Sequence, residues 1–247
     1  MTIKTDGMVI KEKTTGERDR LVTLLTRENG VIRAFVNGAR SPKSKNSAAT
    51  GLLCYSDFVI EKRKTGVYIV TEASAKEVFF SLREDIVSLS LAQYFAELAA
   101  ELSVREENAD EFLRLLLNAV YFVSEKKKDS NLIKAAVELR FLSLAGYMPM
   151  IVACCNCGKY ESEKMRFSVS SGRLYCEECL PEEKTTELPL SVVTAMRHIC
   201  LSDANKVFSF SLSKPSLSLL CDVSERYLKS VTMRGYKTLD FYKAMTR

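Results

Sequence analysis

Four of the eight cysteines form the pattern that most constrains how this chain of 247 residues can fold. They make two pairs, each with two residues between its members, and eighteen residues separate the pairs. This spacing is typical of a four-thiolate zinc site. The pairs are Cys154 with Cys157 and Cys176 with Cys179. Because four sulfurs around one ion leave no open coordination position, the pattern predicts a module that folds around one structural Zn²⁺.

The cysteines also allow other interpretations. Cys155 is a fifth thiol beside the first pair and could replace Cys154 as a ligand. Redox-active pairs would need a helix that starts after a strand, and no βαβ pattern surrounds either pair. Disulfides would need an oxidising compartment, whereas the first residues lack the apolar stretch of a secretion signal. The single histidine, His198, is expected to be a packing or surface group of a helix.

The formal net charge of +5 is unevenly distributed along the chain. Residues 1–64 carry a net charge of +6 and residues 183–247 one of +4, whereas residues 65–150 carry −4. Lys and Arg that cluster on a surface attract phosphate, so the basic ends predict an anionic partner such as nucleic acid. Solvated faces with chance unevenness are the alternative. No apolar run approaches the roughly 18 residues that span a membrane, so we expect a cytoplasmic protein.

Short β-rich runs separated by turn residues fill the first 80 residues. Five short strands in a segment of this length suit a small closed barrel, because closure removes the exposed edges of a small sheet. A five-stranded OB-type barrel is the favoured version, and an SH3-like barrel is the alternative. The expected strands are 8–10, 21–26, 31–36, 55–60 and 67–70.

Between the third and fourth strands, residues 39–51 are polar, basic and without periodicity. Such a loop can follow a phosphate backbone, and cations on neighbouring strands could extend the track. A flexible solvated linker is the alternative. Pro42 stands where a P-loop needs glycine, which excludes nucleotide hydrolysis at this loop. The candidate DNA-binding residues are Arg33, Arg40, Lys43, Lys45, Lys62, Arg63 and Lys64.

From Leu82 onward, apolar residues recur at steps of three and four, which predicts amphipathic helices and an α+β fold overall. About 30 residues around the cysteines cannot bury enough apolar surface alone, so the metal would stabilise them. The C-terminal helices are expected to pack on the central ones. The expected helices are 86–102, 112–123, 132–144, 191–200, 217–228 and 231–244. The expected segments are a barrel (1–80), a first helical part (81–150), a zinc module (151–182) and a second helical part (183–247).

Two stretches of the chain carry a resemblance to a known family. The first runs from Gly16 to Thr26 and continues at residues 37–44, and the second runs from Glu138 to Pro149 and leads into the first cysteine pair. In order and spacing they resemble the RecO family of bacterial recombination mediators over nearly the whole length. The resemblance implies an OB-type barrel and a helical domain with an embedded zinc module, which some members lack. It also implies a nucleoid-associated role in DNA repair by homologous recombination.

The resemblance further implies specific partners. Members of the family bind single- and double-stranded DNA, anneal complementary strands and, with RecR, help load RecA onto DNA covered by single-stranded DNA-binding protein (SSB). No constellation of general acid, base or nucleophile stands out, so no enzymatic activity is expected. Two functions of other classes remain as alternatives. One is a protein-interaction scaffold without nucleic-acid binding, and the other is a metal-dependent hydrolase, which would need an open coordination position.

Overall fold

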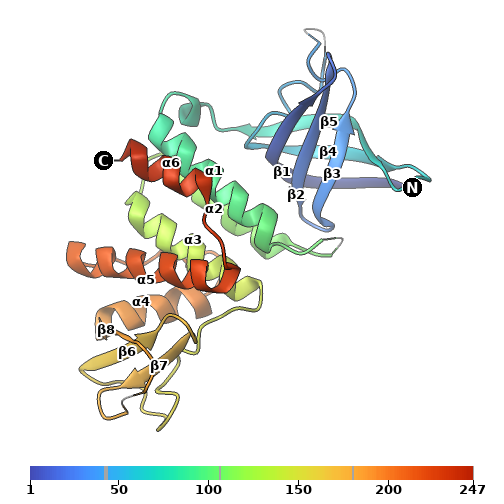
Figure 1. Cartoon of the computed structure of the whole chain (residues 1–247). Coiled ribbons are helices and arrows are strands. Elements are labelled where there is room, and N and C mark those ends of the chain that lie inside the picture. The colour runs from blue at the N-terminus through green and yellow to red at the C-terminus, as the bar shows by residue number, and fades with distance from the viewer. Residues whose placement is uncertain (42–43, 106, 180, 247) are drawn as a thin grey trace. The chain divides into compact units, whose positions relative to one another are not determined.

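The computed structural model describes residues 1–41, 44–105, 107–179 and 181–246. Contacts divide the chain into two compact units. Unit 1 contains residues 1–127 and the C-terminal segment that begins at Tyr236, and unit 2 contains residues 128–235. Unit 2 is therefore an insertion between two parts of unit 1 (Figure 1). The helices are divided between the units, whereas the sequence pattern placed them in one helical domain.

Unit 1 begins with a closed five-stranded barrel. The order around the barrel is β1-β2-β3-β5-β4, and β4 pairs with β1 to close it. All neighbouring strands are antiparallel except β3 and β5, which pair in parallel. This topology confirms the predicted OB-type barrel. Its strands are β1 (Thr2–Thr15), β2 (Asp19–Thr26), β3 (Gly30–Val36), β4 (Cys54–Lys62) and β5 (Tyr68–Val78).

The long strand β1 serves both sides of the barrel. Its first half pairs with β4 and its second half with β2, and the register shifts between Val9 and Lys11. After this bulge, Lys11 and Lys13 lie on the outer surface. Inward residues of all five strands alternate with outward ones and form the barrel core. The core includes Val9, Val22, Leu24, Ile32, Ala34, Phe58, Ile60 and Val70.

The described part of the loop after β3 packs back on the barrel. Ala49, Thr50 and Leu53 are buried. The side-chain amide of Asn46 donates a hydrogen bond to a carbonyl of β5 and accepts one from the backbone N–H of Ala73. Residues 44–53 are therefore packed against the barrel, which argues against the flexible-linker alternative for this part of the loop.

Four helical segments complete the described part of unit 1. Asp85 begins the longest of them, because its carboxylate accepts a hydrogen bond from the second residue of the helix. The last helix packs along α1, where the buried ring of Tyr236 contacts Tyr94 edge-on and Thr238 donates to Glu97 (Figure 1). The segments are η1 (Phe80–Arg83), α1 (Ile86–Leu102), α2 (Asp110–Ser124) and α6 (Lys237–Met245).

Arg27, which follows β2, joins the barrel to the connection between α1 and α2. Its guanidinium donates hydrogen bonds to Asp6 of β1 and also pairs with Asp110, the first residue of α2. Its carbonyl accepts a hydrogen bond from the backbone N–H of Ala109. The barrel and the helices of unit 1 are thus joined by both side-chain and backbone contacts at one turn.

In its described residues, unit 2 has three helices and a small antiparallel sheet of order β7-β6-β8. Helix α3 packs against both α4 and α5. Between α3 and α5, the buried ammonium of Lys134 pairs with Glu138 and Glu225. Among the described residues, no helix is long and apolar enough to cross a membrane. The elements are α3 (Ser130–Leu144), β6 (Lys164–Ser168), β7 (Arg173–Cys176), β8 (Thr186–Pro189), α4 (Leu190–Leu201) and α5 (Lys214–Thr232).

Replacing Asp6 with Asn should destabilise the protein in a pH-dependent way. The hydrogen bonds from Arg27 lower the pKa of the Asp6 carboxyl to about 2, although burial raises it. Because this folded-state pKa lies below the unfolded value, the carboxylate stabilises the fold above about pH 4, and the contribution is lost as the pH falls towards 2. Urea unfolding should show an Asp6→Asn loss of about 2 kcal/mol at pH 7 that shrinks towards zero near pH 2. A loss that stays constant down to pH 2 would contradict this assignment.

Replacing Gly30 with Ala should destabilise unit 1 more than the same change at Gly16. Both glycines have a positive φ, +58° and +62° respectively. A Cβ at Gly30 would lie 2.3 Å from the backbone oxygen of Val104, which accepts a hydrogen bond from Val31, whereas a Cβ at Gly16 meets nothing within 4 Å. Gly16→Ala should therefore cost only the backbone strain of about 1–2 kcal/mol. Gly30→Ala should cost more than about 3 kcal/mol, because it also separates the turn from the helices. Equal losses in urea unfolding would show that this close contact does not matter.

Candidate metal centre and nucleic-acid interface

Four cysteine thiols of unit 2 lie close together. The Sγ atoms of Cys154, Cys157, Cys176 and Cys179 are all within 4.8 Å of one another. Those of Cys157 and Cys176 are 3.7 Å apart. Two thiolates on a tetrahedral ion with metal–sulfur distances of about 2.3 Å are roughly 3.8 Å apart. The cluster therefore has the dimensions of a site that holds one metal ion with four sulfur ligands.

Two tight turns place these thiols. In the first turn, the backbone N–H of Gly158 donates to the carbonyl of Cys154, and the φ of Gly158 is +74°, which glycine adopts without steric cost. In the second turn, Cys176 ends β7 and its carbonyl accepts a hydrogen bond from the N–H of Cys179. Each two-residue spacing thus corresponds to one closed turn that directs both of its sulfurs to the same point.

The two other candidate ligands lie outside this cluster. The Sγ of Cys155 is 3.7 Å from the carbonyl oxygen of Met150, and Cys155 is not one of the clustered thiols. The Nε2 of His198 is 2.8 Å from the carbonyl oxygen of Lys206, and its ring contacts Phe210 edge-on. For the first ligand, the structure therefore groups Cys154 and not Cys155 with the other thiols.

The pKa values of the clustered thiols are shifted in opposite directions. Burial raises the pKa of Cys154, but backbone N–H groups of the turns donate to its sulfur and lower the pKa to about 6. Hydrogen bonding with the sulfurs of Cys157 and Cys176 raises the pKa of Cys179 to about 12. The cluster therefore holds four thiolates together only with a cation among them, and sulfur ligands favour a soft or borderline metal.

Arg197 of α4 holds the segment that carries the first cysteine pair. Its side chain is buried, its Nε donates to the carbonyl of Ile151 at 2.8 Å, and its Nη2 donates to the carbonyl of Tyr160 at 2.6 Å. Its guanidinium carbon also lies 4.1 Å from the centre of the Tyr160 ring. Arg197 thus fixes the chain on both sides of Cys154 and Cys157.

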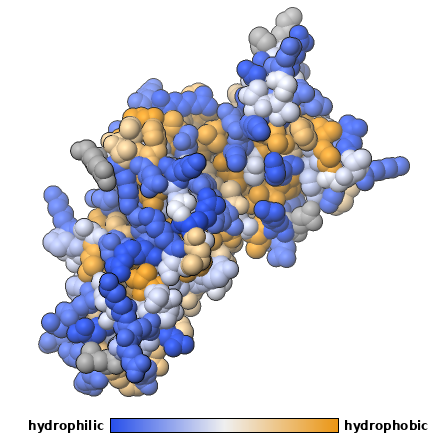
Figure 2. All heavy atoms as spheres, viewed as in Figure 1, coloured by the Kyte–Doolittle hydropathy of each residue, from blue (hydrophilic) through white to orange (hydrophobic). Residues whose placement is uncertain are grey.

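A second candidate site is a positively charged groove of about 620 Å³ on the barrel. The half-buried side chains of Leu21 and Val31 give the groove apolar surface, and Tyr68 adds an aromatic ring. Figure 2 shows hydrophobic residues among hydrophilic ones on the visible face of the barrel. Cations beside apolar and aromatic surface suit a nucleic-acid strand, whose phosphates and bases need different partners. The cations of the groove are Lys11, Lys13, Arg33 and Arg105.

The structure brings some of the sequence-predicted DNA-binding residues to this groove. Arg33 lines it, and the Nζ of Lys62 lies 5.0 Å from the ring centre of Tyr68, which also lines it. Arg63 and Lys64 are exposed in the turn between β4 and β5. Lys62, Arg63 and Lys64 therefore follow one another from the ring of Tyr68 into an exposed turn.

The loop residues among the candidates lie elsewhere. Arg40 is fastened to the turn between β1 and β2, where its N–H donates to the carbonyl of Arg18 and its Nη1 to the carbonyl of Glu17. Lys45 is exposed, and Lys43 lies outside the described residues. Neither Arg40 nor Lys45 is among the described residues that line the groove.

The sequence analysis did not identify three of the groove cations. Lys11 and Lys13 alternate with Glu12 on β1 and pair with β2, so the alternation of this strand could have identified them. Arg105 carries no such signal, because it reaches the barrel through an isolated bridge to Gly30, far away in the sequence.

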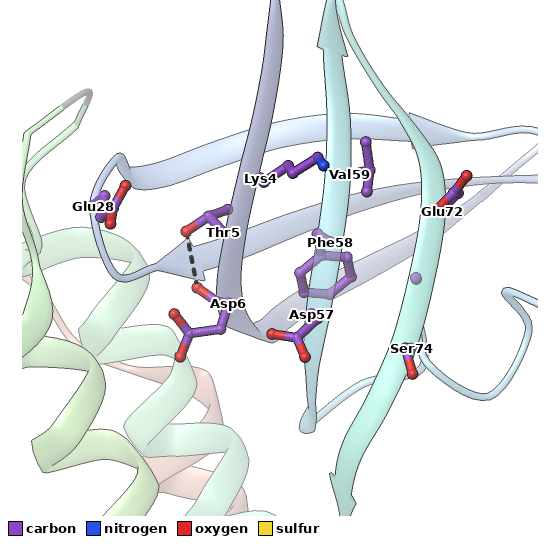
Figure 3. A pocket seen from close by; sticks show the side chains of 10 residues that line it. Lys4, Thr5, Asp6, Glu28, Asp57, Phe58, Val59, Glu72 and Ser74 are labelled. Atoms are coloured by element: carbon purple, nitrogen blue, oxygen red, sulfur yellow. Dashed lines mark hydrogen bonds between the residues drawn. The ribbon is translucent and has the colours of Figure 1, made fainter.

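Another groove of the barrel, about 550 Å³ in volume, is acidic (Figure 3). It crosses the first half of β1, β4 and β5. Lys4 lines it, and Lys76 pairs with one of its carboxylates. Carboxylates repel phosphates, whereas the cations of the other groove attract them, so the two grooves differ in the charge of the ligands that they favour. The carboxylates that line it belong to Asp6, Glu28, Asp57 and Glu72.

The chain matches known proteins over almost its whole length. Residues 1–79 match the family model "Recombination protein O N terminal", and residues 83–240 match "Recombination protein O C terminal". The "DNA repair protein RecO" of Acetivibrio thermocellus is 35% identical over 246 residues, which cover 99% of this chain and 98% of that protein. The protein of the same name from Caldicellulosiruptor saccharolyticus is 30% identical over 241 residues, which cover 98% of each chain. The chain therefore belongs to the recombination protein O (RecO) family.

Proposed function

We propose that this protein acts in DNA repair and binds DNA in the basic groove of its barrel. The observation that carries the proposal is the convergence of four cations from three separate segments on one groove with apolar surface. The OB-type fold supports it, since OB barrels bind oligonucleotides on the face of their second and third strands, where Arg33 lies. The names of the relatives, DNA repair protein RecO, support it as well.

The binding is mainly electrostatic. Lys and Arg side chains replace the counterions of the phosphates, which gives affinity with little sequence preference and a steep dependence on salt. The acidic groove keeps a strand from spreading over the whole barrel, because its carboxylates repel phosphates. The proposed DNA path therefore follows the basic groove and continues past Lys62, Arg63 and Lys64.

In the cell, the protein serves as a mediator of homologous recombination. It binds single- and double-stranded DNA, anneals complementary strands and, with RecR, helps load RecA onto DNA covered by SSB. Membership of the RecO family supports this role. A cation-lined groove reduces the repulsion between two strands that pair, and it needs no covalent chemistry for that task. Because this proposed role acts on chromosomal DNA, we expect the protein at the nucleoid, in the cytoplasm.

The four clustered cysteines hold one structural Zn²⁺. Zinc accepts four thiolates in a closed tetrahedron, which fits the dimensions of the cluster and provides the positive charge that the thiolates need. When bound, the ion joins the turn after Ile151 to the end of β7 and stabilises the module by cross-linking it. Four protein ligands leave no position for a water, so the site has a structural role and not a hydrolytic one.

Neutralising the groove should weaken DNA binding and flatten its salt dependence. The triple variant Lys13→Ala, Arg33→Ala and Arg105→Ala removes three proposed phosphate contacts. For single-stranded DNA, the slope of log affinity against log salt should become less steep by about 2, because each contact contributes about 0.7. Fluorescence anisotropy of a labelled oligonucleotide, titrated at several salt concentrations, measures both quantities.

Two further variants make this test specific. Arg40→Ala with Lys45→Ala tests the loop, and a smaller slope change than in the groove variant is expected. Lys164→Ala, Lys184→Ala and Lys206→Ala remove the same charge from exposed lysines of unit 2 and should leave the slope unchanged. If this control reduced the slope as much as the groove variant, only overall charge would matter and the groove proposal would be wrong.

Elemental analysis of the purified protein should find about one zinc per chain. Replacing Cys176 and Cys179 with Ser should abolish zinc binding and lower the melting temperature, because the module loses its cross-link. Cys155→Ser is the matched control, and it should keep the zinc, since its thiol lies outside the cluster. Loss of zinc in Cys155→Ser together with its retention in Cys154→Ser would overturn the assigned ligand set.

A further inference from the structure

Tyr68 has an unusual position among the aromatic residues of the barrel. It is the one aromatic side chain among the described residues that line the basic groove. It begins β5, where it pairs in parallel with Ala34 of β3, and part of its ring packs against the barrel core. The ring is therefore half-buried on a rigid strand, with its remaining surface in the groove.

The residues around this ring offer a ligand two kinds of contact. Four cations supply contacts for phosphates. Leu21, Val31 and Tyr68 instead offer apolar and aromatic surface, which phosphates do not need. A ligand that uses the whole groove must carry negative charges next to flat, weakly polar rings. Single-stranded DNA has this chemistry, because its bases are unpaired and lie within a few ångströms of its phosphates.

We propose that Tyr68 is the platform on which one unpaired base of the bound strand stacks. The inference rests on the proposed DNA binding in this groove and adds a specificity to it. In a duplex the faces of each base are already covered by the neighbouring bases, so stacking on Tyr68 favours single strands. The cations contact the phosphates of both forms, and Tyr68 distinguishes between them.

Lys62 contacts the same ring. Its Nζ lies 5.0 Å from the ring centre of Tyr68. A cation–π contact at an exposed site is weaker than the stacking of a base on an aromatic ring. A base therefore competes successfully for the ring, and the long, flexible Lys62 side chain then reaches an adjacent phosphate.

The test compares full-length wild type with Tyr68→Ala and Tyr68→Phe on three labelled ligands. These are oligo(dT), an abasic strand of the same length, and a duplex. Tyr68→Ala should bind oligo(dT) about 5- to 100-fold more weakly, with an unchanged salt slope, because it removes stacking and no charge. Its affinity for the abasic strand and the duplex should equal that of wild type. Tyr68→Phe should behave like wild type on all three ligands, because it keeps the ring.

A second measurement reports the stacking directly. The chain contains no tryptophan, so Tyr68→Trp introduces a single fluorescent indole into the groove. Oligo(dT) should quench this fluorescence and the abasic strand should not. Tyr147→Trp is the matched control, since Tyr147 is an exposed tyrosine of unit 2 and its indole should be insensitive to either ligand.

The outcomes separate this inference from the function on which it rests. If wild type bound none of the three ligands at low salt, the proposed DNA binding itself would fail. If wild type bound them and Tyr68→Ala weakened all three equally, or weakened none, the stacking role would be wrong while DNA binding stood. Circular dichroism and the melting temperature of Tyr68→Ala show whether an equal loss on all ligands comes from misfolding.

Discussion

The pairing of Arg27 with Asp6 and Asp110 is the interaction on which the organisation of unit 1 depends. It ties the end of β2 to β1 on one side and to the start of α2 on the other. Next to it, the turn at Gly30 approaches the connection between α1 and α2 so closely that only a residue without a side chain fits. The same approach forms the bridge that brings Arg105 to the basic groove. The helices thus complete the surface of the barrel that we assign to DNA, and the first 80 residues alone would lack one of its cations.

The barrel carries many of its positive and negative charges in two separate grooves, which its net charge alone does not show. The basic groove lies over the second half of β1, β2, β3 and the start of β5, whereas the acidic groove lies over the first half of β1, β4 and a later part of β5, and most of their charged residues occupy outward positions of the strands. Because the inward positions are taken by the core, the outward residues can vary in charge without a penalty in packing. An OB-type barrel can therefore combine a groove that attracts phosphates and a groove that repels them without a change of fold.

The sequence predicted the features that depend on local periodicity or spacing. The five strands, the OB-type barrel and the RecO resemblance are confirmed, and the four cysteines chosen by spacing do lie together. Lys11 and Lys13 were missed, although their alternation with Glu12 along β1 could have identified them. The packing of α6 on α1 agrees with the expected packing of the C-terminal helices on the central ones. The position of Arg105 was not predicted, because it depends on a contact between distant segments that no local pattern of the sequence encodes. Arg40 appeared to share a track with Arg33, although the structure fastens it to the turn between β1 and β2.

The insertion of unit 2 into unit 1 has a consequence for biosynthesis. The ring of Tyr236 is fully buried, and it reaches its place beside Tyr94 only after all of unit 2 has been translated. The N-terminal barrel and α1 therefore emerge from the ribosome before α6, the helix that covers α1, has been synthesised. During that interval α6 is not yet present to cover α1, so unit 2 can complete its own fold before unit 1 is complete. In this protein the part that is made first is the last to be finished.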